Sequence, residues 1–333
     1  MEERLRFALL GPVRAWRGED EVDLGPPQQR TVLVVLLLAQ GSQVLTSGLI
    51  DAVWGTKAPA SAPGSLRTYV HGLRRALEPG GDPVSSVIRS TGDGYQLRVV
   101  AGQVDVGVFR ELTVRAEGLR GGGDVVGAVG LLRKALGLWE GTALAGVRGE
   151  FALTHRRRLE ELRLSAEAAR VRAELDLGGH VEVVADLNRL VAEHPLDERL
   201  RELLMLALYR SGRQAAALAV YREAQTLLAE ELGVDPGPGL QTLYQRVLRA
   251  DARLLTVPST TTPAPASGSA QDGGPASGSG SVRDGVADSA SGAVGEGVGG
   301  SGGGLPVVPA QLPAALAAFV GREGELAEMD RLP

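Results

Sequence analysis

The 333-residue sequence contains no cysteine, which excludes disulfide bonds, thiolate zinc sites and a cysteine nucleophile. Its four histidines lie far apart, so a histidine-rich metal site is not expected. The longest apolar run, Val32 to Ala39, is far shorter than the roughly 20 residues that cross a bilayer. The N-terminus lacks the charged, apolar and small-residue order of a signal peptide. We therefore expect a cytoplasmic protein with no metal, no cofactor and no membrane segment.

Lysine is scarce as well, because Lys57 and Lys134 are the only two and all other basic residues are arginine. The net charge of −5 is unevenly distributed, with +1 over residues 1–100, −1 over residues 101–255 and −5 over residues 256–333. The N-terminal part remains compatible with a nucleic-acid partner, since local charge decides such contacts. Its near-neutral balance predicts modest, salt-sensitive affinity for non-specific DNA.

The stretch Ser65–Leu77, SLRTYVHGLRRAL, predicts an amphipathic helix with a basic face. Its apolar residues recur at helical spacing: Leu66, Val70, Leu73 and Leu77. The opposite face has no acidic residue and carries Thr68, His71 and Arg75, flanked by Arg67 and Arg74. The same pattern is typical of an ordinary surface helix whose arginines only meet solvent, and His71 also fits a neutral surface histidine.

A predicted β-hairpin follows this helix, over Val87–Val99, with a tight turn at Gly92-Asp93-Gly94. A basic helix followed by a basic-edged hairpin is the layout of a winged helix-turn-helix, which reads DNA. In this interpretation three residues of the wing reach the DNA backbone or the minor groove: Arg89, Ser90 and Thr91.

The elements before the basic helix fit the same interpretation. Three short strands are expected over residues 4–10, 13–17 and 22–24. A buried helix over residues 28–40 follows, and then a short helix capped by Thr46 or Ser47. Residues 57–64 form the turn before the basic helix. Trp54 either donates its indole N–H to a DNA phosphate or is buried in the core.

From residue 105 to about residue 251 the sequence predicts helices throughout. Gly178 and Gly212 lie 34 residues apart, the period of tetratricopeptide repeats, and similar helices follow both glycines. This spacing indicates an α-solenoid of about three helical hairpins. The run Arg156-Arg157-Arg158 is either a basic contact patch or a solvated helix face balanced by Glu160-Glu161.

Residues 256–304 consist mainly of Ser, Gly, Thr, Pro and Ala. Such a segment buries too little apolar surface to offset the entropy of ordering, so a disordered linker is expected. Order is expected to resume at about Gln311. The sequence contains no GxxxxGK[ST] motif and therefore no phosphate-binding loop of that type.

The first part of the chain resembles the OmpR-type winged-helix output domain of phosphorelay regulators. Residues 72–77, GLRRAL, are similar to the family pattern R-L-R-R-K-L, and residues 91–95, TGDGY, to R-G-x-G-Y. Gly72, Ala76 and Thr91 replace basic residues of these patterns, which removes possible phosphate contacts. We expect no phosphoacceptor receiver domain ahead of the winged helix.

The segments LLGPVRAW, PPQQRTVLVVLLL and LIDAVWG, together with the helical region, resemble a narrower group. This is the Streptomyces antibiotic regulatory protein (SARP) family, in which a bacterial transcriptional activator domain follows the winged helix. FVGRE at residues 319–323 is similar to the opening segment of the NTPase domains found downstream in large members. With no phosphate-binding loop, we expect a truncated form of such a regulator rather than one that has lost its ATPase.

The resemblance implies a mainly α chain: a winged helix-turn-helix (α+β), an all-α tetratricopeptide-like solenoid and a disordered linker. The expected divisions are the DNA-binding domain at 1–100, the activator domain at 101–255, the linker at 256–304 and the opening of an absent NTPase domain at 305–333. The candidate DNA-binding residues are Trp54, Arg67, Thr68, His71, Arg74, Arg75, Arg89, Ser90 and Thr91.

The implied function is a sequence-specific activator in the nucleoid that binds direct repeats near the promoter −35 region as a head-to-tail dimer. It recruits RNA polymerase through the sigma factor and the alpha and beta subunits, for secondary-metabolite (antibiotic) genes. No nucleophile–base–acid constellation occurs, so an enzyme is not expected. Two alternatives are the regulatory part of an ATP-switched signal-transduction NTPase and a helical-repeat scaffold.

Overall fold

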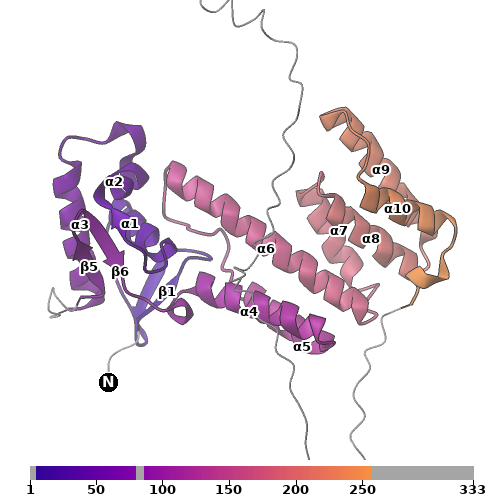
Figure 1. Ribbon diagram of the computed structural model, residues 1–333, viewed down its shortest axis with the longest axis horizontal. Coiled ribbons are helices and arrows are strands. Elements are labelled where there is room, and N and C mark those ends of the chain that lie inside the picture. The colour runs from indigo at the N-terminus through magenta and orange to yellow at the C-terminus, as the bar shows by residue number, and fades with distance from the viewer. Residues whose placement is uncertain (1–4, 80–85, 257–333) are drawn as a thin grey trace, which may run out of the picture. The chain divides into compact units, whose positions relative to one another are not determined.

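The computed structural model describes residues 5–79 and 86–256, which form small antiparallel sheets and many helices (Figure 1). The first sheet has the order β1 (Leu5–Ala8), β2 (Arg14–Arg17), β3 (Asp20–Glu21). Three helices follow: α1 (Pro27–Leu38), α2 (Thr46–Trp54) and α3 (Ala62–Leu77). The second sheet has the order β4 (Val44–Leu45), β6 (Gly94–Leu97), β5 (Ile88–Thr91). The predicted winged helix-turn-helix is confirmed.

The first sheet differs from the prediction in its third strand. The two-residue loop Gly18-Glu19, with Gly18 at a φ of +61°, turns the chain back immediately after β2. Pairing therefore starts at Asp20, opposite Arg17, and the predicted strand over residues 22–24 is wrong. In β1, Leu5 and Phe7 are buried while Arg6 between them is exposed, the alternation expected of a strand with one face on the core.

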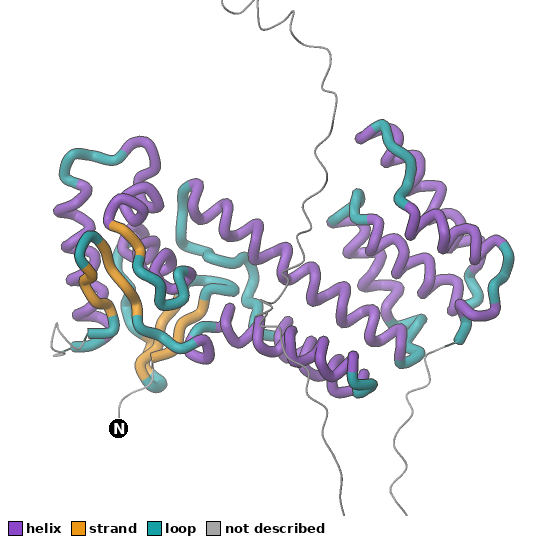
Figure 2. The backbone as a smooth tube through the Cα atoms, viewed as in Figure 1, coloured by secondary structure: helices purple, strands orange, loops and turns teal. Residues whose placement is uncertain are grey.

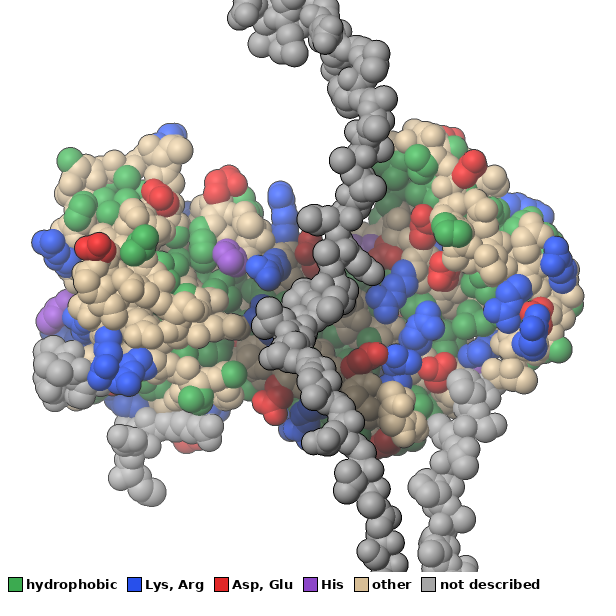
Figure 3. Space-filling view, viewed as in Figure 1, with side chains coloured by type: hydrophobic (Ala, Val, Ile, Leu, Met, Phe, Trp, Pro, Cys, Tyr) green, Lys and Arg blue, Asp and Glu red, His purple; other side chains and the backbone are tan. Residues whose placement is uncertain are grey.

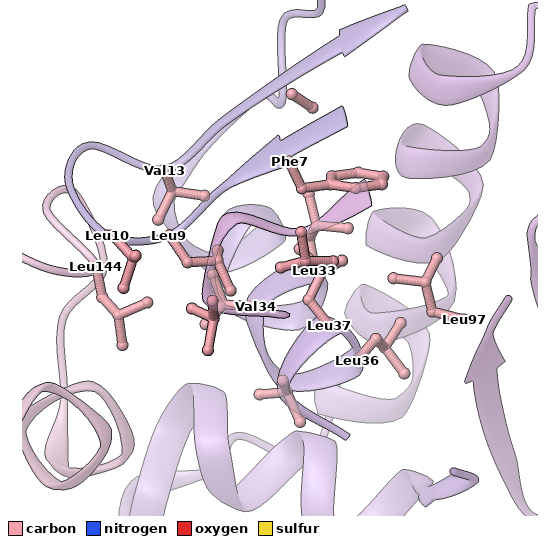
Figure 4. Packing of buried hydrophobic residues seen from close by; sticks show 14 of the residues in the cluster. Phe7, Leu9, Leu10, Val13, Leu33, Val34, Leu36, Leu37, Leu97 and Leu144 are labelled. Atoms are coloured by element: carbon pink, nitrogen blue, oxygen red, sulfur yellow. The ribbon is translucent and has the colours of Figure 1, made fainter. Parts of the chain in front are cut away.

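Helix α1 is the central helix of the N-terminal part, because every side chain of 32–37 is buried. It packs against α2, α3 and β6, and Figure 4 shows Leu33 and Val34 beside Phe7 and Leu9. The helix ends at Leu38, two residues before the predicted end. The cause is local, since Gln40 has a φ of +50° and cannot continue a right-handed helix.

The starts of α2 and α3 both differ from the sequence-based expectation. A side-chain cap of α2 by Thr46 or Ser47 is wrong, because Leu45 holds the cap position and makes no side-chain cap bond. Thr46 is instead tied to the second sheet, as described below. Helix α3 begins at Ala62 rather than near Ser65, since a proline in the first turn loses no helical hydrogen bond and fits there.

Seven α-helices make up most of the C-terminal part of the described chain (Figures 1 and 2). They are α4 (Asp105–Gly121), α5 (Val125–Leu136), α6 (Glu150–Asp176), α7 (Val183–Glu193), α8 (Glu198–Arg210), α9 (Gln214–Leu232) and α10 (Pro238–Leu248). Gly178 and Gly212 lie in the α6–α7 and α8–α9 turns with φ values of +90° and +75°. The chain reverses there, as the repeat spacing predicts, because glycine adopts this conformation without strain.

The loop between β1 and β2 is hydrogen-bonded to the loop between α5 and α6. Leu144 N–H donates to the Leu9 carbonyl at 2.9 Å, and Glu140 N–H donates to the Leu10 carbonyl at 3.0 Å. One buried apolar cluster extends from β1 to Ala166 of α6, and a second extends from Ala168 of the same helix to the end of the described chain. Helix α6 therefore contributes to both cores, and the predicted domain boundary at residue 100 stays a prediction.

The predicted linker beyond Thr256 and the predicted NTPase opening at 305–333 lie outside the described residues. Among the residues that are described, no helix combines the length and the apolarity that a bilayer-spanning segment needs.

Candidate nucleic-acid interface

Helix α3 has two distinct faces. Leu66, Val70, Leu73 and Leu77 are all at most 1% exposed and pack in the core with α1 and α2. Four side chains of the opposite face are exposed: Arg67, Thr68, His71 and Arg75. At about 100° per residue these four positions fall in one stripe along the helix. The predicted division of this helix into a buried face and a basic face is confirmed.

The exposed stripe of α3 is positively charged and open to a partner. Within the part of the chain that the structure describes, neither Arg67 nor Arg75 forms an ion pair or donates a hydrogen bond. The Thr68 hydroxyl donates to the Gly64 carbonyl at 3.3 Å, which leaves its methyl group on the exposed surface. In Figure 3, Lys or Arg side chains and one histidine gather at the left edge, over α3 and the neighbouring hairpin.

Arg74 joins the helix to the hairpin. Its Nε donates to the Ile88 carbonyl and its Nη2 donates to the Ser90 Oγ, both at 2.9 Å. One turn later, Glu78 accepts from the Ser86 hydroxyl at 2.7 Å and from the Val87 N–H at 2.9 Å. The hairpin is thus attached to α3 by side chains four residues apart. The predicted contact of Arg74 with DNA stays a prediction, and the sequence alone did not indicate its link to the wing.

Gly72 of α3 lies beside the Gln29 side chain of α1. A Cβ atom built at this residue would lie 2.5 Å from Oε1 of Gln29, a buried α1 side chain that donates to the Leu24 carbonyl. A larger residue at this position would displace the Gln29 amide and disturb its bond to the Leu24 carbonyl. The family pattern has a basic residue at this position, and the close contact with Gln29 explains why this chain has glycine there.

The hairpin β5–β6 forms the wing and is held at its tip by α2. Thr46 donates to the Asp93 carbonyl from its N–H at 2.8 Å and from its hydroxyl at 2.6 Å. Gly94 pairs with Leu45 of β4, and a Cβ atom at Gly94 would collide with the Val44 carbonyl. Strand β4, which the sequence-based analysis missed, therefore fixes the wing to the turn between α1 and α2.

The three candidate residues of the wing lie on opposite faces of β5, because side chains alternate along a strand. Ser90 is exposed and accepts from Arg74, so it faces α3. Arg89 and Thr91 lie on the other face, where Nε of Arg89 and Oγ1 of Thr91 are buried with no hydrogen-bond partner among the described residues. All three remain predictions as DNA contacts.

Trp54 lies at the end of α2 and is half-buried, stacked on the ring of Tyr69 of α3 with centroids 6.1 Å apart. The stack on Tyr69 packs one face of the Trp54 ring against α3. Its contact with DNA stays a prediction.

The three arginines of the run Arg156-Arg157-Arg158 have different surroundings. Arg156 donates to the carbonyls of Ala143, Leu144 and Val147, at 2.8 to 3.3 Å, and so holds the loop before α6. Arg157 and Arg158 are exposed. Neither sequence-based alternative, a contact patch or a solvated face, included the structural role of Arg156.

Two family models match the chain, and they meet at the link between β6 and α4. Residues 19–97 match the family "Transcriptional regulatory protein, C terminal", and residues 104–248 match the "Bacterial transcriptional activator domain". The first match contains all nine candidate DNA-binding residues, and the second contains helices α4 to α10.

Curated relatives are regulatory proteins. The chain is 50% identical over 258 residues to the regulatory protein AfsR of Streptomyces coelicolor, a match that covers 77% of the chain and 25% of the relative. It is 35% identical over 253 residues to the regulatory protein DnrI of Streptomyces peucetius, with 74% of the chain and 93% of the relative covered. The chain thus spans about a quarter of the length of AfsR and matches nearly all of DnrI.

A solved structure has a similar fold. It is Mycobacterium tuberculosis EmbR in complex with a low-affinity phosphopeptide, with a TM-score of 0.72 and 35% sequence identity. The match covers 75% of this chain and 66% of that chain. The similarity extends across most of the residues that the structure describes.

Proposed function

The chain belongs to the SARP family of transcriptional activators, and from this premise we propose that helix α3 reads promoter DNA in the major groove. The observation that carries the proposal is the exposed stripe of Arg67, Thr68, His71 and Arg75 on a helix whose other face is fully buried. The major groove admits an α-helix and presents a distinct donor and acceptor pattern for each base pair.

The proposed roles of the α3 residues follow from their chemistry and their positions. Arg75 lies in the stripe without an ion pair to any residue that the structure describes, and its guanidinium fits O6 and N7 of a guanine. The Thr68 methyl fits a thymine methyl, because the hydroxyl is occupied by the helix backbone. His71 lies between them, at the centre of the stripe. Arg67, at the edge of the stripe, contacts a phosphate.

Arg74 and the wing take a second role in this proposal. Since the Arg74 guanidinium binds the wing, it sets the angle between wing and helix, and the remaining donor capacity faces the DNA backbone. Arg89, Ser90 and Thr91 contact the backbone or the minor groove beside the helix. Trp54, at the helix end next to α3, donates to a phosphate.

One winged helix reads only a few base pairs, so useful specificity requires more than one copy on the DNA. We propose that two copies bind head to tail on direct repeats near the promoter −35 region, with half-sites about one helical turn apart. The helical part then recruits RNA polymerase by contacts with its sigma factor and its alpha and beta subunits. The proposed targets are secondary-metabolite genes in the nucleoid, as the family resemblance implies.

A second candidate function is the DNA-binding and regulatory part of a larger, ATP-switched NTPase. What favours it is the resemblance of residues 319–323 to the opening of such domains, together with the 25% coverage of AfsR. In that case this chain supplies the DNA-binding part and binds no ATP itself. Tight ATP binding by the purified chain would contradict this division of roles.

The proposal is tested by selecting bound sequences from a pool of random duplex DNA with the full chain. We expect enrichment of a direct repeat with half-sites about one helical turn apart. The Arg67→Ala, Arg75→Ala double variant should lose specific binding, while Arg222→Ala, an exposed arginine on α9, should bind as the parent does. Unchanged selection by the double variant would show that α3 is not the reading element.

A further inference from the structure

A hollow of about 330 Å³ lies where the winged helix continues into α4. Its walls come from the end of α1, the segment after β6 and the first two turns of α4. They are apolar apart from the side chains of Gln40 and Arg110. The lining residues are Leu37, Leu38, Gln40, Val99, Val100, Ala101, Val104, Val106, Gly107 and Arg110. This volume and this mostly apolar wall are typical of small-molecule sites.

Arg110 is the one charged side chain among the lining residues of this hollow. It is half-buried, and in the described part of the chain its guanidinium forms no ion pair and donates no hydrogen bond. Two other arginines of α4 differ, since Arg115 pairs with Glu111 and Arg120 pairs with Glu117. A guanidinium beside an apolar wall is stabilised by an anionic partner.

The shape of the hollow is fixed by the backbone around it. A Cβ atom at Gly107 would collide with the Ala101 carbonyl, so the short helix Ala101–Gln103 packs directly on α4. Gln103 also donates to the Leu5 carbonyl at 3.0 Å, which holds this short helix against β1. At the rim, Val100 is 61% exposed, an apolar side chain that a ligand would cover. The hollow is therefore preformed and open on one apolar side.

We propose that this hollow binds a small amphiphilic carboxylate. The apolar chain of the ligand lies against the leucines and valines of the wall, where its removal from water drives binding. The carboxylate pairs with Arg110, whose planar guanidinium offers two parallel N–H donors. A neutral or cationic amphiphile of the same chain length makes the apolar contact with the wall but cannot form the ion pair with Arg110.

The position of this site gives it contacts with both family-matched segments. Val99, Val100 and Ala101 lie between the matches that end at residue 97 and begin at residue 104. Leu37 and Leu38 belong to α1, the helix on which α3 packs. A bound carboxylate therefore touches the DNA-binding part, the activator part and the link between them. The proposal does not depend on the proposed DNA sequence or polymerase contacts.

The experiment uses decanoate as the probe and the full chain as the receptor, without DNA. Affinity is measured by calorimetry, and the site is located from methyl NMR shifts of Leu37, Leu38, Val99 and Val106. We expect saturable shifts at these methyl groups and clearly weaker binding of decanol and decyltrimethylammonium. Arg110→Gln should weaken decanoate binding about tenfold or more, the usual effect of losing a charged hydrogen-bond partner. The matched control on the same helix, Arg115→Gln, should bind as the parent does.

Three outcomes would overturn the proposal. One is the absence of saturable shifts at these methyl groups. Another is equal affinity for decanoate and decanol. A third is shifts confined to Leu132 and Leu162, which line a smaller hollow of about 170 Å³ that Arg110 also borders. If Arg110→Gln lowered the melting temperature, Arg110→Lys would keep the charge and should retain part of the decanoate affinity.

Discussion

Arg74 of helix α3 donates to the Ser90 hydroxyl of the wing at 2.9 Å, and this bond joins the helix to the hairpin. The same guanidinium donates to the Ile88 carbonyl at 2.9 Å. A residue of the basic face is thus occupied by the protein itself, whereas Arg75, the next residue, is free of any partner in the described ranges. Adjacent arginines therefore have separable effects on stability and on binding.

We predict that Arg74→Ala lowers the free energy of unfolding by about 1 kcal/mol, because two hydrogen bonds from a partly exposed charged group are lost. Ser90→Ala should cost less, since the bond to the Ile88 carbonyl remains. Arg75→Ala should change stability by no more than about 0.5 kcal/mol. Urea denaturation gives these values, and amide exchange of β5 should quicken only in the first two variants. Equal effects of Arg74→Ala and Arg75→Ala would refute the structural role of Arg74.

We predict that Arg67 and Arg75 affect DNA binding in different ways. Loss of a phosphate contact in Arg67→Ala should weaken binding to all sequences and reduce the salt slope by about 1. Loss of a base contact in Arg75→Ala should relax the preference at one base pair, by about 1–3 kcal/mol. Titrations at several salt concentrations against the selected site and its point variants measure both effects. If Arg67→Ala relaxed the preference for one base pair and Arg75→Ala did not, the roles assigned to the two arginines would be reversed.

Helix α3 could be predicted from the sequence because its buried face follows from the local spacing of its apolar residues. Leu66, Val70, Leu73 and Leu77 recur with the helical period, and all four are buried. The residue at which α3 begins could not be predicted in the same way. Pro63 fits a loop as well as the first turn of a helix, so the sequence did not distinguish the two. The repeat turns at Gly178 and Gly212 were predictable for a similar reason, because the spacing is a property of the chain alone.

The contacts that shape the site depend on residues distant in sequence, and local patterns do not contain them. Arg74 and Arg156 look like surface arginines, and both bind backbone carbonyls at least nine residues away. Strand β4 has only two residues and exists because β6 passes beside it. Which arginines remain free for DNA is therefore a tertiary property.

We predict opposite effects for alanine at two glycines. Gly94→Ala should destabilise the protein by about 1–3 kcal/mol, because its Cβ atom would collide with the Val44 carbonyl and backbone atoms cannot move aside cheaply. Gly130→Ala, in the exposed interior of α5 with no atom within 4 Å of the new Cβ, should stabilise by about 0.5–1 kcal/mol. Thermal unfolding and DNA titration test both variants. A stabilising Gly94→Ala would show that the wing does not need this close approach.

Asp105, the first residue of α4, connects that helix to the loop after β1. Its Oδ2 accepts from the N–H groups of Leu9 and Leu10 at 2.7 and 2.8 Å, and its Oδ1 accepts from Val106 N–H at 2.7 Å. Burial raises the pKa of this carboxyl to about 6, and the negative charge of Glu140 acts in the same direction. The three N–H donors favour the ionised form and oppose part of this shift.

We predict that Asp105 makes the folded state less stable as the pH rises from about 4 to about 6. The folded protein holds the Asp105 proton up to a higher pH than the unfolded chain, whose carboxyl has the ordinary value of 3.8, so stability falls across this window and levels off above it. The difference between the two pKa values of Asp105 corresponds to a change of about 3 kcal/mol in the free energy of unfolding. The unfolding free energy of the parent relative to Asp105→Asn should decrease by up to this amount between pH 4 and pH 7, and carboxyl NMR should show titration near pH 6. If the three N–H bonds instead outweighed burial, the pKa would be depressed and the same difference would increase with pH, so the sign of the slope alone decides between the two effects.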